Sequence, residues 1–273
     1  MKYGQLVVGP AGSGKSTYCY AMQQHIRAMN RTCFVVNLDP AAEEFKYDCH
    51  LDIRELISLD DVQSDEELAL GPNGGLVFCM EYLMNNLDWL EEAIDAAEDD
   101  YFLFDCPGQI ELYSHLPVMP KIIEQLKVWD FNICCCFLLD THFVLEPNKF
   151  ISGALTTLAT MVSFELPAVN ILTKQDQLND EEKEIIDDFL ENNVNNIIEN
   201  GKYTKWDIKH KKLTQAIADV LEDYSLVKFQ PLNIKDEDSL GDLLLVINNN
   251  IQYDENQEVR DIYPEDDDGY DDE

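Results

Sequence analysis

The sequence has few positive charges. Its 273 residues include 19 lysines and arginines against 54 aspartates and glutamates, for a formal net charge of −35. Such a surface repels the phosphates of nucleic acids and of anionic lipids, so we expect neither nucleic acid nor membrane as a direct partner. Long apolar runs are absent too. The longest, residues 133–139, is far shorter than the roughly 20 residues that span a bilayer.

The eight cysteines form no C-x-x-C pair and have no histidine spacing suited to zinc. Three of them, residues 134–136, lie inside an apolar run, and we interpret them as small core residues. This pattern favours a reducing compartment. The first residues lead directly into a predicted strand and a glycine-rich loop, so we expect no signal peptide.

The composition and length indicate one globular domain followed by an acidic tail. A hydrophobic content of 45% is ordinary, and the chain is long enough for one substantial α/β core. We predict a domain over residues 1–253 with a helical insertion at 40–98. Residues 254–273 hold eleven acids and one arginine, so they carry −10 of the charge. We expect this tail to be disordered, and we favour a solubilising role over docking on a basic partner.

The most informative segment is residues 9–17, GPAGSGKST, which directly follow the apolar run 6–8. It matches the pattern G-x-x-x-x-G-K-[ST], in which glycines bring backbone N–H groups close to phosphate and a following helix points its positive end there. Lys15 supplies a charge for the β- and γ-phosphates, and the Ser16 hydroxyl is placed to bind Mg²⁺. The predicted nucleotide-binding residues of this loop are Gly12, Ser13, Gly14, Lys15, Ser16 and Thr17.

Alternating strand and helix patterns predict a doubly wound, mostly parallel sheet flanked by helices. A strand, a helix and a second strand within the first forty residues form a βαβ crossover, which makes those strands parallel. We expect strands at 3–8, 32–38, 101–104, 132–139, 168–172 and 226–229. We expect helices at 15–29, 76–97, 111–127 (interrupted by Pro117 and Pro120), 149–163, 180–199, 208–223 and 239–251, with a helical turn at 52–56.

Side chains suited to Mg²⁺ and water follow two of these strands. Asp105 begins a D-x-x-G segment, where it can bind Mg²⁺ through water while the Gly108 N–H contacts the γ-phosphate. Gln109 comes next and is a candidate for orienting the attacking water. Asp39, at the end of another strand, is suited either to Mg²⁺ or to polarising that water. Which of Gln109 and Asp39 positions the water stays open.

Residues 173–176, TKQD, follow the fifth strand and match the [NT]-K-x-D pattern of guanine sites. Guanine presents two adjacent donors that the Asp176 carboxylate accepts together, whereas adenine would place a lone pair against it. The Lys174 stem can pack over the base while its ammonium supports the loop, and Thr173 is a further predicted nucleotide-binding residue. The segment therefore argues for GTP and GDP over a kinase or ATPase that uses adenosine triphosphate.

Gly71-Pro72-Asn73 is a turn signal with no phosphate-binding logic of its own, since Pro72 lacks an N–H. This segment becomes informative because the predicted catalytic residues include no additional lysine or arginine, so another group must help to position the water. Pro10 stands where related dimerising ATPases place an additional lysine. An asparagine on a rigid loop, offered by a partner subunit, would suit the task of positioning water.

Together these segments, with Asn37-Leu38-Asp39-Pro40-Ala41, Gly74-Gly75 and Ile110-Glu111-Leu112, resemble the GPN-loop GTPases over about residues 1–253. The resemblance implies a P-loop fold of the dimerising GTPase class, with two subunits facing each other across their nucleotides. It places Asn73 at the partner's phosphate site, and Asp39, Asp105 and Gln109 around Mg²⁺ and water.

The resemblance also implies a sister paralogue as dimer partner, with a homodimer as the alternative. It further implies a role in the assembly and nuclear import of RNA polymerase II. The implied location is cytoplasmic, with shuttling to the nucleus left open. An alternative function is a nucleotide-dependent interaction subunit with little hydrolysis of its own.

Overall fold

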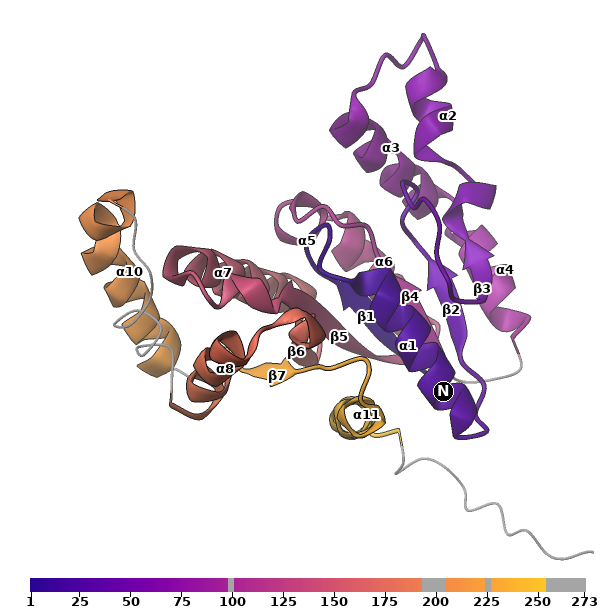
Figure 1. Cartoon of the computed structure of the whole chain (residues 1–273). Helices are drawn as coiled ribbons and strands as arrows, with labels where there is room; N and C mark the ends of the chain where they lie inside the picture. Colours follow the sequence, from indigo (N-terminus) through magenta and orange to yellow (C-terminus); the bar gives the residue numbers. More distant parts are fainter. Residues whose placement is uncertain (98–100, 193–204, 224–226, 254–273) are drawn as a thin grey trace, which may run out of the picture.

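The computed structural model describes residues 1–97, 101–192, 205–223 and 227–253. Seven strands form one sheet in the order β3-β2-β4-β1-β5-β6-β7, and each neighbouring pair is parallel (Figure 1). The strands are β1 Lys2–Val8, β2 Phe34–Asn37, β3 Cys49–Asp52, β4 Tyr101–Asp105, β5 Phe131–Asp140, β6 Ala168–Thr173 and β7 Phe229–Pro231. The predicted doubly wound parallel sheet is confirmed.

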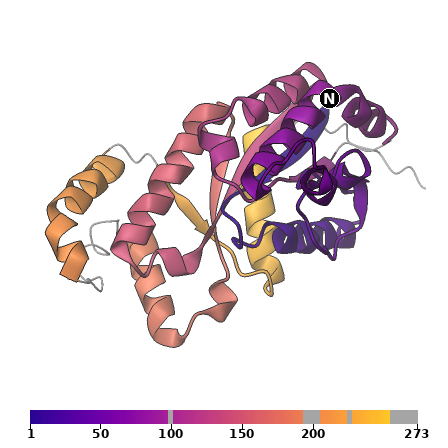
Figure 2. The same cartoon turned by 90° about the horizontal axis from the view of Figure 1, so that it is seen from above.

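Helices cover both faces of this sheet (Figure 2). α1 (Lys15–Ala28) and α11 (Glu237–Ile251) pack on one face, where their buried side chains join one apolar cluster. On the opposite side lie α3 Pro72–Asn85, α4 Leu87–Asp95, α5 Glu111–Ser114, α6 Val118–Val128, α7 Pro147–Phe164 and α8 Asp180–Asn192. α10 (Lys205–Asp223) packs against α7 at the outer end of the molecule (Figure 1). α2 (Leu59–Ser64) and the start of α3 project beyond the ends of β1 and β2 (Figure 1).

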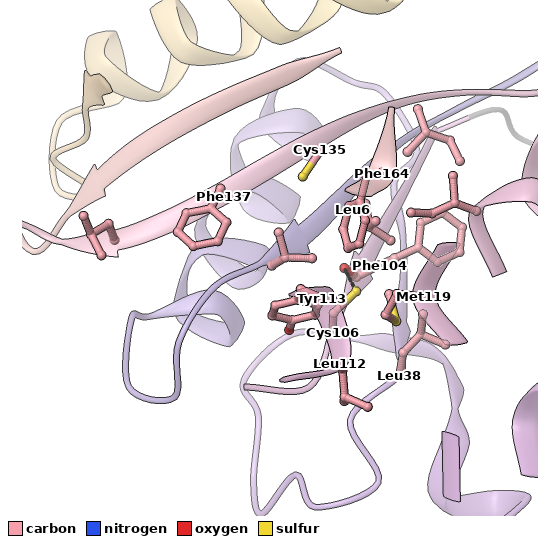
Figure 3. Packing of buried hydrophobic residues seen from close by; sticks show 14 of the residues in the cluster. Leu6, Leu38, Phe104, Cys106, Leu112, Tyr113, Met119, Cys135, Phe137 and Phe164 are labelled. Carbon is pink, nitrogen blue, oxygen red and sulfur yellow. Dashed lines mark hydrogen bonds between the residues drawn. The ribbon is translucent and has the colours of Figure 1, made fainter. Parts of the chain in front are cut away.

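The strands bury alternate side chains on opposite faces, as the pleat of a sheet requires. Figure 3 shows Leu6, Phe104 and Cys135 of three central strands packed together on the α6 and α7 side. The neighbouring Cys134 and Cys136 face the α1 and α11 side. All three thiols are free and buried, so their interpretation as core residues is confirmed.

The predicted helix at 76–97 is two helices, because Asn86 leaves the helical region with φ −129° and ψ 41°. The first of them, α3, begins at Pro72, so the Gly-Pro-Asn segment forms a helix start and the prediction of a simple turn there is wrong. Proline is well suited to the first helical position, since its φ is already helical and its missing N–H would have no partner there.

The strand β3 was not predicted, because only one of its four side chains is buried and no alternating pattern marks it. The turn expected at 52–56 is confirmed at Ile53–Glu55. β7 begins three residues later than predicted.

Residues 193–199 of one expected helix, residue 226 of an expected strand and the acidic tail 254–273 lie outside the described residues. Within the described ranges, no helix combines the length and apolar character needed to cross a bilayer.

A buried polar chain joins α1, the sheet and α11. The Tyr18 hydroxyl donates to Gln5 Oε1 at 2.6 Å, and Gln5 Nε2 donates to the Tyr101 hydroxyl at 2.8 Å. The Tyr101 hydroxyl in turn donates to Asn248 Oδ1 at 3.2 Å. All four side chains are buried, so these bonds replace the water that their polar groups have lost; the Cys136 thiol is a second, weaker donor to Gln5 Oε1 at 3.7 Å.

We expect Tyr18→Phe to lower the free energy of unfolding by about 1–3 kcal/mol, because Gln5 Oε1 loses its hydroxyl donor in a buried site. Urea titration followed by circular dichroism measures the change. Tyr113→Phe is the matched control, because the Tyr113 hydroxyl is buried without a hydrogen-bond partner among the described residues. Equal losses in the two variants would contradict a stabilising role for the chain.

Candidate nucleotide site

The glycine-rich loop lies between β1 and α1, at the carboxyl edge of the sheet. β1 has β4 on one side and β5 on the other, so the loop sits where the strand order reverses, the usual ligand position in such sheets. Gly9 has φ 144°, and a Cβ there would lie 2.3 Å from the Leu138 carbonyl oxygen of β5. Only glycine allows this close approach.

The first turn of α1 faces the same edge. Gly14 caps the helix in the left-handed region with φ 93°, so the following N–H groups are directed outward as in anion-binding helix starts. Lys15 is buried, and its ammonium donates to the Gly9 carbonyl at 3.1 Å and the Pro10 carbonyl at 3.3 Å. Ser16 and Thr17 are exposed on the first turn, and Ser13 is buried.

The D-x-x-G segment after β4 contacts this loop directly. A Cβ at Gly108 would lie 2.9 Å from Ala11 Cα, so the two backbones touch. Asp105 ends β4 and is buried; its Oδ2 accepts a hydrogen bond of 3.0 Å from the Tyr47 hydroxyl. Among the described residues, its Oδ1 has no hydrogen-bond partner.

Burial raises the pKa of Asp105 to about 6, although the nearby hydroxyls of Ser16 and Tyr47 and the charge of Lys15 lower it. The pKa of Asp39 is also raised by burial, against an opposing hydrogen bond from the Ala41 N–H. The two acids lie at the ends of neighbouring strands: Asn37 pairs with Asp105 in the sheet, and the Leu38 N–H donates to the Asp105 carbonyl at 2.8 Å. Such a pair gains from a cation between or beside its members.

The predicted base-binding segment is joined to the phosphate loop. The Thr173 hydroxyl at the end of β6 donates to the Ser13 carbonyl at 2.7 Å. Lys174 follows with a left-handed φ of 64°, and its ammonium contacts Asp140 Oδ2 at 2.7 Å. Burial would raise the pKa of Asp140, but hydrogen bonds from Lys174 and His142 hold it below its usual value.

The Asp176 carboxylate is largely buried, with 14% of its side chain exposed. Its Oδ2 lies 2.8 Å from the ammonium of Lys235, which is 71% exposed. Lys235 stands between β7 and α11, in a turn closed by a hydrogen bond from the Asp236 N–H to the Asn233 carbonyl. Two separate loops therefore meet at the predicted base site.

Asn73 and Gln109 also lie together. Gln109 Nε2 donates to Asn73 Oδ1 at 3.1 Å within the same chain. Asn73 is exposed near the start of α3, and Gln109 is half-buried beside Gly108. The structure thus brings the Gly-Pro-Asn segment to the D-x-x-G segment.

Sequence reasoning missed three participants: Tyr47, Asp140 as the partner of Lys174, and Lys235. Tyr47 and Lys235 lie in irregular segments, and no pattern near them indicates a partner. Asp140 had a usable signal, since it closes a buried strand at the ligand edge, as Asp105 does.

The chain matches, over residues 7–253, the model of a family described as "Conserved hypothetical ATP binding protein". It is 52% identical over 259 residues to GPN-loop GTPase 3 of Danio rerio, covering 95% of this chain and 91% of that protein. Identity to GPN-loop GTPase 3 of Kluyveromyces lactis is 45% over 262 residues, 95% of each chain.

Among solved structures, the fold is similar to PAB0955 from Pyrococcus abyssi, described as a GTPase in apo form. The TM-score is 0.73 with 23% identity, over 91% of this chain and 97% of that one. This likeness supports the fold. The named relatives are 52% and 45% identical to this chain over 95% of its length. Together with the arrangement of the phosphate and base segments, this shows that the chain belongs to the GPN-loop GTPase family.

Proposed function

We propose that this GPN-loop GTPase binds GTP with Mg²⁺, hydrolyses it to GDP, and works as a switch in a dimer. One observation carries the nucleotide part: the Thr173 hydroxyl is hydrogen-bonded to the Ser13 carbonyl at 2.7 Å. The phosphate loop and the base loop are thereby held next to each other. A ligand that carries phosphates at one end and a purine at the other fits both loops.

The base loop favours guanine. The Asp176 carboxylate accepts from two adjacent guanine donors, and its ion pair with Lys235 holds it in place. The matched family's description mentions ATP, whereas the similar relatives are named GTPases. Adenine would leave the Asp176 carboxylate facing a lone pair, so we propose GTP as the substrate.

The residues around Asp105 fit a magnesium ion. Its buried Oδ1 has no protein partner in the described chain, the Ser16 hydroxyl lies nearby, and Asp39 shares the neighbourhood. No cluster of three or more His, Cys, Asp or Glu side chains suited to a metal occurs among the described residues. This suits Mg²⁺, which binds few protein groups and takes phosphate and water oxygens besides. When bound, Mg²⁺ neutralises charge on the β- and γ-phosphates.

The chain's own groups supply the remaining steps. Lys15 and the first turn of α1 hold the phosphates, and the Gly108 N–H contacts the transferred group. Gln109 or Asp39 orients the attacking water, and of the two only Asp39 has a carboxylate that can accept its proton. The Asn73 contact restricts Gln109, which supports the alternative of a nucleotide-dependent interaction subunit with little hydrolysis of its own.

For the dimer we propose a sister GPN-loop paralogue, with self-association as the alternative. Its support is the exposed position of Asn73 near the start of a projecting helix, at the edge where the phosphates bind. There it faces Gln109 of its own chain and is accessible to a second subunit's phosphate site. We further propose a role in the assembly and nuclear import of RNA polymerase II, with a cytoplasmic location and shuttling to the nucleus. These rest on the family resemblance.

We expect Asp176→Asn to weaken GTP binding about 10- to 100-fold and to improve binding of xanthosine triphosphate, because the amide presents a donor where guanine also donates. Fluorescence competition among GTP, ATP and xanthosine triphosphate measures this. Asp180→Asn, the same change at a fully exposed acid nearby, is the control. Unchanged GTP affinity in Asp176→Asn would reject the base assignment.

We expect Lys15→Ala to lower GTP turnover of the paralogue pair about 10²-fold or more, since the phosphates lose their fixed cation. Phosphate release under single-turnover conditions is the measurement, with Lys183→Ala as the control for charge. If the variant lost partner binding while the partner's turnover persisted, the interaction-subunit alternative would replace the enzymatic proposal.

We expect the chain to form a heterodimer with a sister paralogue that a non-hydrolysable GTP analogue tightens relative to GDP, and Asn73→Ala to weaken this nucleotide effect. Light scattering coupled to size-exclusion chromatography gives the masses, for the chain alone and with the paralogue. If the chain kept the mass of a monomer with either nucleotide and with the paralogue present, the dimer mechanism would be rejected, while the guanine site would be unaffected.

A further inference from the structure

The segment between β2 and β3, which also carries Asp39, places Tyr47 against the predicted magnesium site. Tyr47 is buried with 4% of the residue exposed, and its hydroxyl donates to Asp105 Oδ2 at 3.0 Å. Asp105 is itself only 2% exposed. With Oδ2 engaged, the carboxylate has its buried Oδ1 left without a partner among the described residues.

Tyr47 is fixed from its carboxyl side by helix α1. Gln23, a buried residue of that helix, accepts from the Asp48 N–H at 3.0 Å and donates to the Asp48 carbonyl at 2.9 Å. Both backbone groups of the next residue are therefore tied to one side chain. Arg27, one turn further along α1, also pairs with the Asp48 carboxylate.

Tyr47 is fixed from its amino side by Arg54. The guanidinium donates to the carbonyls of Ala42 at 2.9 Å and Glu43 at 2.8 Å, while Asp52 holds it through both carboxylate oxygens. Arg54 also lies 4.9 Å from the Phe45 ring centre, and that ring stacks on Tyr47 at 4.4 Å with an interplanar angle of 3°. The loop is built so that the Tyr47 ring has little freedom.

We propose that Tyr47 is a positioning residue for magnesium: its hydroxyl holds one oxygen of Asp105, so that the other is presented to the Mg²⁺ shell. This inference rests on the proposed GTP and Mg²⁺ site and adds to it a residue in the insertion. Removing the hydroxyl frees the carboxylate to turn about its Cα–Cβ and Cβ–Cγ bonds. The energy of ordering it must then come from metal binding.

The test measures release of a fluorescent GDP, N-methylanthraniloyl-GDP, across a titration of Mg²⁺ buffered with EDTA. We expect Tyr47→Phe to raise the Mg²⁺ concentration that half-restores slow release about three- to tenfold, the range of the net contribution of one ordinary hydrogen bond. The release rate without Mg²⁺ should change little. The GDP release rates with and without Mg²⁺ are compared in one preparation of each variant, so the result does not depend on the fraction of protein that is folded.

Tyr113→Phe is the matched control, because it removes a hydroxyl that is equally buried and has no partner in the described structure. Should Tyr47→Phe fail to fold, Arg54→Lys loosens the same loop without touching the hydroxyl, and we expect the same direction of change. A Tyr47→Phe titration that overlies wild type would overturn the inference. If GDP did not bind to the wild-type protein, or if its release rate did not depend on Mg²⁺, the proposed function itself would be rejected.

Discussion

The close approach of the phosphate loop to neighbouring backbone is the constraint on which the site depends. Gly9 lies so near the Leu138 carbonyl that a Cβ would be 2.3 Å away, and Gly108 lies against Ala11. These contacts hold three chain segments at one edge of the sheet without any side chain between them. Because parallel strands all end at this edge, the polar groups that follow β1, β4 and β6 converge there.

Electrostatics then sets what the site accepts. The protein has a formal net charge of −35. Two of its acids, Asp39 and Asp105, are partly or fully buried near the phosphate loop, and burial raises the pKa of both. Lys15 is the buried cation beside them, and its ammonium binds loop carbonyls. A polyanionic ligand in such surroundings is favoured when it brings its own cation, which supports the proposal of a nucleotide with Mg²⁺.

The segment 40–98, predicted as an insertion, contacts the residues around the phosphate loop at two places. Near its start Tyr47 contacts Asp105, and farther along Asn73 contacts Gln109. Both contacts reach the segment that in switch GTPases responds to the γ-phosphate. The projecting α2 and the start of α3 are therefore connected to the candidate nucleotide site, an arrangement that suits the proposed signalling of nucleotide state to a second subunit.

The sequence by itself determined the phosphate loop, the D-x-x-G segment, the base loop and the parallel sheet that unites them. Each is a local pattern whose glycines, charges or hydrophobic period specify backbone conformation within a few residues. Only the tertiary structure decided the Tyr47–Asp105 bond, the Asp176–Lys235 pair, the edge strand β3 and the helical start at Pro72. Tyr47 and Asp105 are 58 positions apart, and such partners are chosen by packing across the sheet, which no local pattern records.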